Sequence, residues 1–138
     1  MASGPFGDSC ADNFNESFPP TTTLPADAVL VSATRCIHPT QVVSGDGEWL
    51  MRIEQKATSG LDALAAALRL PSQEPSPGQV CPAIGHVPII ITVTDTTGRS
   101  IHPEVPKDSC GAPLVAAVNA IAALSWTDVS TTKVQQVG

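Results

Sequence analysis

Tyrosine is absent from the 138-residue chain, and aromatic residues of all kinds make up only 4% of it. The interior must therefore be filled mainly by aliphatic side chains. Hydrophobic residues still supply 42% of the chain, which indicates a folded protein rather than a disordered one. A chain of this length is expected to form one domain with a single modest core.

Basic residues and long apolar runs are also scarce. There are 7 Lys and Arg against 13 Asp and Glu, which gives a formal net charge of -6. We expect no nucleic-acid partner, because binding to phosphates requires a basic face. No apolar run is long enough to cross a bilayer, so we expect no membrane span. Residues 1–5 lack the basic start and the apolar stretch of an export signal, and we expect that such a signal was removed.

The motifs of common enzyme sites are missing too. No serine lies in a G-x-S-x-G motif, and no glycine-rich loop precedes a helix as phosphate binding requires. His38, His86 and His102 are scattered, and two of them precede proline, so surface histidines are a better interpretation than metal ligands. We predict that the protein is not an enzyme and that it needs neither a cofactor nor a metal. A hydrolase or metal enzyme ranks well below a binding function.

What the chain does contain is four cysteines at wide spacings. They are Cys10, Cys36, Cys81 and Cys110, and no two form a C-x-x-C pair. An even number of separated cysteines in a small chain rich in proline and glycine predicts two disulfides and an oxidising compartment. We therefore expect a secreted, extracellular protein. Four cysteines allow three pairings, and their spacing does not choose among them. The competing interpretation is four reduced thiols in the cytosol.

Alternating and β-branched apolar residues predict five strands. They cover residues 28–36, 48–57, 88–94, 99–102 and 129–137. A turn at 44–47 joins the first two strands, and a turn at 95–98 joins the next two. We expect residues 1–27 to form an irregular arm and residues 28–138 to form a single α+β domain.

Two helices are predicted between the strands. Ser59 is expected to cap the first helix, and Pro71 to end it. Its apolar face is formed by Leu61, Leu64, Ala65 and Leu68. The second helix is expected to begin near Pro113. Its buried stripe is formed by Leu114, Val118 and Ile121.

The predicted order of elements is β-β-α-β-β-α-β. It favours an α+β fold with a mostly antiparallel sheet of about five strands and both helices packed on one face. Such a fold leaves the other face of the sheet exposed, which would allow a homodimer.

The most informative segment follows the long polar loop 71–79 and precedes the strongest predicted strand. It consists of Val80, Cys81, Pro82, Ala83 and Ile84. If Cys81 is disulfide-bonded and Pro82 fixes its own φ angle, this stretch is held extended and exposed. A protease cleft binds such a strand by β-pairing, and pre-organisation lowers the cost of ordering it. The simpler interpretation is that Cys81 and Pro82 only staple the entry of a strand.

These residues resemble the subtilisin-inhibitor-like proteins that Streptomyces secretes. The resemblance is carried by Cys-Pro-Ala-Ile at 81–84, Pro-Ile-Ile-Ile-Thr-Val at 88–93 and the later Cys110. It implies the same order of elements and a reactive loop that inhibits serine proteases. It also implies a bridge between Cys81 and Cys110, and we predict a Cys10–Cys36 bridge for the other two cysteines.

The resemblance implies a role for each residue of the loop. Cys81 would anchor the loop, and Pro82 would make it rigid. Ala83 would fill the primary pocket of the protease, and Ile84 would follow the scissile bond. Because Ala83 is small and apolar, the implied partner is an extracellular protease of the subtilisin or elastase type.

The resemblance covers mainly residues 80–110. Cys10 and Cys36 do not match the positions of the family's other disulfide, and the segment 85–87 is about one residue longer than the pattern. A second resemblance, to exported actinobacterial proteins with a Cys…Asp-x-x-Gly-Arg…Pro…Cys-Gly pattern, brings no activity with it. The alternative hypothesis is therefore a non-catalytic exported binding or structural module with the same fold.

Overall fold

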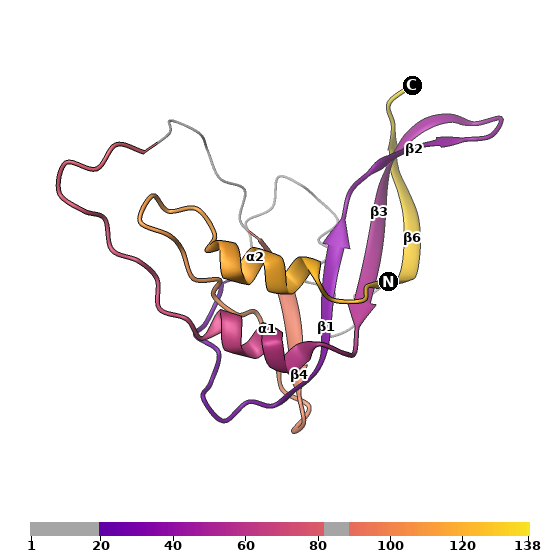
Figure 1. The fold of residues 1–138 in the computed structure, drawn as a ribbon. Coiled ribbons are helices and arrows are strands. Elements are labelled where there is room, and N and C mark those ends of the chain that lie inside the picture. The colour runs from indigo at the N-terminus through magenta and orange to yellow at the C-terminus, as the bar shows by residue number, and fades with distance from the viewer. Residues whose placement is uncertain (1–19, 82–88) are drawn as a thin grey trace.

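The computed structural model describes residues 20–81 and 89–138, which form one sheet covered by two helices (Figure 1). The strands are β1 Leu30–Ile37, β2 Thr40–Val43, β3 Gly47–Ala57, β4 Ile91–Asp95, β5 Ser100–Ile101 and β6 Thr127–Gln136. The helices are α1 Leu61–Leu68 and α2 Val115–Ala122. The expected α+β class, antiparallel sheet and two helices are confirmed. The described residues contain six strands rather than about five, and their elements follow the order β-β-β-α-β-β-α-β.

The additional strand, β2, continues β1 along the same edge of β3. Ile37 of β1 pairs with Ile53, and three residues later Thr40 of β2 pairs with Leu50, so the register is unbroken. The break falls at His38 and Pro39, where proline has no N–H to donate to the sheet. The carbonyl of Pro39 still accepts a hydrogen bond from the N–H of Met51 at 2.8 Å. β1, β2 and β3 therefore form one hairpin, which is longer than the one that the sequence predicts.

The remaining strands extend this hairpin on both sides. β4 pairs with β1 and with β5, while β6 pairs antiparallel with the other edge of β3. The strand that was predicted most strongly therefore lies inside the sheet. It begins at Ile91, later than expected, and Ile91 and Val93 are buried in the core.

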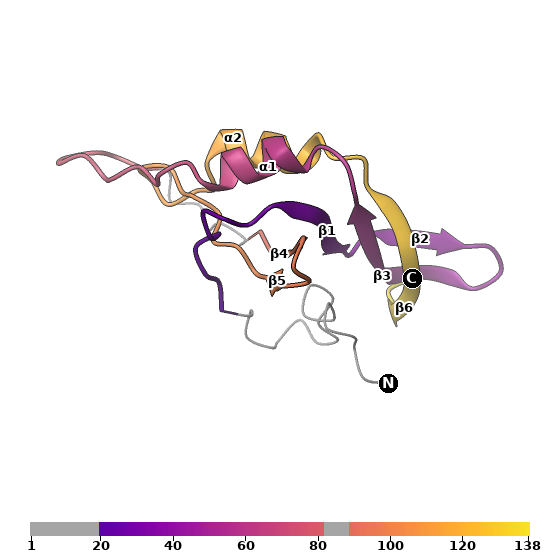
Figure 2. The same ribbon diagram turned by 90° about the horizontal axis from the view of Figure 1, so that it is seen from below.

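Both helices lie on the same side of the sheet, as Figure 2 shows. The predicted apolar face of α1 is confirmed, because Leu61, Leu64, Ala65 and Leu68 are all buried. Ser59 does not cap this helix. Its N-cap is Gly60, which has a φ of 75° and no side-chain capping bond. Only residues 58–60 connect β3 to α1, and a left-handed glycine turns the chain within that distance.

α2 is anchored less deeply than α1. Ala117 and Ile121 are its buried residues, and Leu114 just before the helix packs against the core. The prediction that Val118 is buried is wrong, since 38% of its surface is exposed. The face that packs on the core is instead formed by Leu114, Ala117 and Ile121, which are spaced three and four residues apart as one side of a helix requires. Within the part of the chain that the structure describes, neither helix is long and apolar enough to cross a membrane.

The segment before β1 forms no regular element over residues 20–27, yet it is packed against the domain. Leu24 is buried in the core. Thr22 forms a parallel bridge with Pro103: its N–H donates to the carbonyl of His102, and its carbonyl accepts from the N–H of Glu104, each at 2.9 Å. This bridge fixes the path of the chain after β5.

A single carboxylate organises the turn between β4 and β5. Asp95 is buried, with 2% of the residue exposed. It accepts hydrogen bonds from the hydroxyl of Thr97 at 2.7 Å, from the N–H groups of Thr97 and Arg99, and from the guanidinium of Arg99 at 2.7 Å. The Thr97 hydroxyl and Arg99 stabilise the charged form and lower the pKa of Asp95 to about 2, against the opposing effect of burial.

We expect Asp95→Asn to lower the melting temperature at pH 7 and to flatten its dependence on acid. Because the folded pKa lies below the ordinary value of 3.8, ionised Asp95 stabilises the fold above about pH 4. That stabilisation is lost as the pH falls towards 2. Thermal unfolding followed by circular dichroism between pH 7 and 2 measures both effects. Glu74→Gln, in an exposed loop, is the control and should leave the profile unchanged; an equally steep acid profile in Asp95→Asn would contradict the assignment.

Candidate functional site

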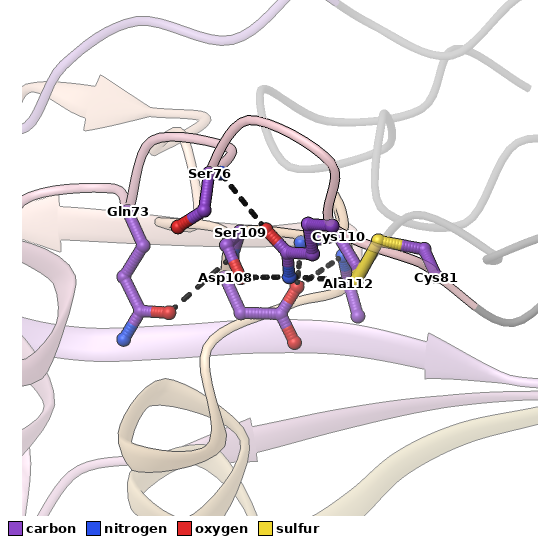
Figure 3. Close-up of a disulfide and its surroundings, with 8 residues drawn as sticks. Gln73, Ser76, Cys81, Asp108, Ser109, Cys110 and Ala112 are labelled. Atoms are coloured by element: carbon purple, nitrogen blue, oxygen red, sulfur yellow. Dashed lines mark hydrogen bonds between the residues drawn. A yellow bond between two sulfur atoms is a disulfide. The ribbon is translucent and has the colours of Figure 1, made fainter.

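One disulfide joins the segment that precedes β4 to the loop that precedes α2 (Figure 3). It links Cys81 to Cys110, with 29 residues of sequence separation and 5.5 Å between the two Cα atoms. The pairing of Cys81 with Cys110 is therefore confirmed. The structure describes this one bridge where two were expected. Cys36 is not a free thiol, but Cys10 lies outside the described residues, so the pair Cys10–Cys36 stays a prediction.

The segment that leads to Cys81 is exposed along its whole length. Every residue from 71 to 81 is exposed, and Val80 exposes 92% of its surface. Figures 1 and 2 show this segment projecting from the end of the molecule opposite to the β2–β3 hairpin. Its prolines at 71, 75 and 77 exclude a helix, which accounts for the extended path.

A tight turn lies within this exposed segment, just before Val80. The N–H of Gln79 donates to the carbonyl of Ser76 at 3.1 Å. Pro77 and Gly78 occupy the two central positions, and Gly78 has a φ of 75°. A turn with proline followed by a left-handed glycine is a favoured combination, so the local sequence specifies it.

The second loop, residues 107–113, is closed at its base and stiffened from within. Its base is closed by a bridge between Lys107 and Pro113. Inside the loop, the Asp108 carboxylate accepts from the N–H groups of Cys110 at 2.9 Å and Ala112 at 3.0 Å, while the N–H of Asp108 donates to the carbonyl of Ala112 at 2.7 Å. Cys110 is therefore held on a rigid support.

Hydrogen bonds tie the exposed segment to the second loop at several points besides the disulfide. The N–H of Gln73 donates to the carbonyl of Lys107 at 2.8 Å, and the N–H of Lys107 donates to the hydroxyl of Ser72 at 3.0 Å. Nearer the disulfide, the side-chain amide of Gln79 donates to the hydroxyl of Ser109 at 2.6 Å. We call residues 71–81 and 107–113, joined in this way, the two-loop platform.

The structure places part of the predicted reactive loop and leaves the rest outside its description. Val80 and Cys81 stand at the exposed edge of the two-loop platform. Pro82, Ala83 and Ile84 lie outside the described residues. The chain is described again from Ile89, which packs against the core just before β4. The described residues nearest to this gap are thus both anchored, Cys81 by the disulfide and Ile89 by the core.

Sequence reasoning missed the residues that hold the platform together, above all Gln79, Asp108 and Ser109. Local signals for some of them exist. Ser-Pro-Gly-Gln at 76–79 is a turn sequence, and Asp108 followed by Gly111 is typical of a loop in which a carboxylate bonds the backbone. Their partners across the two loops lie about 30 residues apart in the sequence, and no periodicity indicates such contacts.

The histidines of the described residues lie on or beside strands, not on the platform. His102 follows β5, and its Nδ1 lies 3.2 Å from the hydroxyl of Thr92. His38 lies between β1 and β2, where burial and then the positive charge of Arg52 lower its pKa. His86 lies outside the described residues. Among the residues that the structure does describe, no group of three or more His, Cys, Asp or Glu side chains could hold a metal ion.

Comparison with known proteins returned no match: no family model, no curated protein and no solved structure is significantly similar to the chain.

We expect the double substitution Cys81→Ser with Cys110→Ser to lower the free energy of unfolding by about 2–4 kcal/mol. The bridge closes a loop of about 30 residues, and its main effect is to restrict the unfolded chain. Urea unfolding of the variant and of the unchanged protein, both without reductant, gives the difference. A change below about 0.5 kcal/mol, typical of surface substitutions, would show that the bridge adds little to the fold.

Proposed function

We propose that the protein is a secreted, substrate-like inhibitor of serine proteases, with Val80, Cys81, Pro82, Ala83 and Ile84 as its reactive loop. One observation carries the proposal. Val80 and Cys81 are exposed, and Cys81 is bonded to a stiff second loop. The resemblance of residues 80–110 to the subtilisin-inhibitor-like proteins supplies the role of the loop.

The mechanism rests on pre-organisation. A flexible peptide must be ordered when it enters a protease cleft, and this cost weakens its binding. An exposed segment that is already anchored at Cys81 avoids part of the cost and can pair with the cleft as an added strand. After cleavage between Ala83 and Ile84, the disulfide would keep the new C-terminal end in place. The bond would then be remade as readily as it is broken, and the complex would persist.

The scarcity of charged residues around the loop agrees with proteases that bind apolar side chains. Glu74 is the only charged residue between 71 and 81, and residues 80–85 carry no charge. Ala83 in the primary pocket favours proteases that accept small apolar side chains over those that require Lys or Arg. The proposed partners are therefore subtilisin-like and elastase-like proteases in the extracellular space, where a disulfide is stable.

A second candidate function is a non-catalytic exported binding or structural module without inhibitory activity. It is favoured by the place of the bridge in the fold. Cys110 lies five residues before α2, and Ile89 packs on the core eight residues after Cys81. The same disulfide therefore stabilises the connection between helix layer and sheet, whether or not a protease binds.

Mixing the protein with subtilisin and with pancreatic elastase separates these functions. We expect stoichiometric inhibition of at least one protease and a complex that survives gel filtration. Residual activity titrated against increasing protein gives the stoichiometry. If neither enzyme is inhibited at a stoichiometric ratio, or if the chain is digested through 83–84 without a stable complex, the inhibitor proposal fails and the module is favoured.

The substitution Ala83→Lys tests the role of the loop directly. A charged side chain does not fit a small apolar pocket, so inhibition of subtilisin or elastase should weaken by about 30-fold or more. Trypsin, which requires a basic residue in its pocket, should become a target. Ala66→Lys is the matched control, since it adds the same charge on the exposed side of α1, and it should inhibit like the unchanged protein.

A further inference from the structure

Gln79 makes an unusual set of contacts for an exposed side chain. Its Nε2 donates to the hydroxyl of Ser109 at 2.6 Å and lies within hydrogen-bond distance of the Cys110 Sγ, at 3.3 Å. Its Oε1 accepts from the N–H of Ser76 at 3.0 Å, and its own N–H donates to the carbonyl of Ser76. One amide thus connects the turn of the exposed segment to the second loop and to the disulfide.

Holding Gln79 in these contacts costs conformational entropy, and the rest of the fold does not depend on them. An exposed glutamine that is held in one rotamer loses most of the conformational entropy of its side chain. The core makes no use of Gln79, which lies outside the cluster of buried side chains. The effect of the contacts falls on its neighbours Val80 and Cys81.

A single covalent tether fixes a position but not a direction. The disulfide fixes where Cys81 lies, while the backbone of Val80 could still swing about that point. A second attachment at Gln79, two residues earlier, defines the line along which the chain approaches the disulfide. Both attachments end on the same loop, at Ser109 and Cys110, so the direction is set by the loop that Asp108 hydrogen-bonds from within.

We propose that Gln79 is a positioning residue, which holds the entry of the reactive loop in an extended, exposed orientation through Ser109. The proposal rests on the inhibitor function above and adds to it the second point of attachment. Gln79 contacts no protease in this account. It acts by holding Val80 and Cys81 in the orientation in which a protease would bind them. After cleavage it helps the disulfide to retain the new C-terminal end.

The test compares Gln79→Ala, Ser109→Ala and the double variant. We expect Gln79→Ala to raise the inhibition constant for subtilisin about three- to tenfold, since one ordered side chain is worth roughly that factor in binding. The melting temperature should stay close to that of the unchanged protein. If Gln79 acts through Ser109, the double variant should inhibit no worse than Gln79→Ala alone. Gln41→Ala removes an exposed glutamine of β2 and should change neither quantity.

A second readout does not depend on any protease. Thiol–disulfide exchange requires that the attacking thiolate reach one of the two sulfur atoms. The Gln79 amide lies against the Sγ atom of Cys110 and restricts access to it. Dithiothreitol should therefore reduce the Cys81–Cys110 bridge faster in Gln79→Ala than in Gln41→Ala. Trapping the released thiols and mass analysis of the peptides give the rate.

The outcomes separate the two proposals. If the unchanged protein inhibits neither protease, the inhibitor function fails, and the reduction rate alone decides whether Gln79 holds the entry of the loop. If the unchanged protein inhibits while Gln79→Ala inhibits equally well, Gln79 is not a positioning residue. Equal reduction rates in Gln79→Ala and Gln41→Ala would overturn the attachment itself.

Discussion

The arrangement of the two-loop platform depends on the covalent bond between Cys81 and Cys110. Without it, an exposed segment rich in proline and glycine would be held to the second loop by a few solvent-accessible hydrogen bonds, each worth about 1 kcal/mol. The disulfide keeps the donors and acceptors of these hydrogen bonds close together, so Gln79 and Ser109 form their hydrogen bond at low entropic cost. The disulfide therefore does more than add stability, because it makes the weaker contacts of the platform effective.

The sheet and its core supply the fixed frame for that bond. On one side, β4 carries the chain away from the loop into the interior, where Ile91 and Val93 are buried. On the other side, Thr22 bridges to Pro103, and the N–H of Leu114 donates to the carbonyl of Pro106 at 2.8 Å. The chain is thus fixed on both sides of the second loop, at Pro103 and Pro106 before it and at Leu114 after it. A loop supported at both ends can hold Cys110, and through the disulfide Cys81, in a fixed place.

The sequence predicted the parts of the fold that follow from local pattern. The apolar spacing of α1, the two long strands of the hairpin and the position of β4 were all readable, because periodicity and β-branched residues determine them. The N-cap of α1 could not be predicted in this way, since Gly60 begins the helix through its backbone geometry rather than through a side-chain hydrogen bond. β2 was missed because His38 and Pro39 interrupt a strand whose register nevertheless continues. At the site, Cys81 and Cys110 could be paired by resemblance, whereas the contacts of Gln79 and Ser109 depend on how two distant loops are folded together.

Mapping the disulfides of the folded protein tests the central claim most directly. Digestion without reductant, followed by mass analysis of the linked peptides, shows which cysteines are joined. We expect one linked pair of peptides that contains Cys81 and Cys110. A peptide that links Cys81 to Cys10 or Cys36, or a free thiol at Cys81, would contradict it, because the exposed segment would then lack the anchor on which its orientation depends.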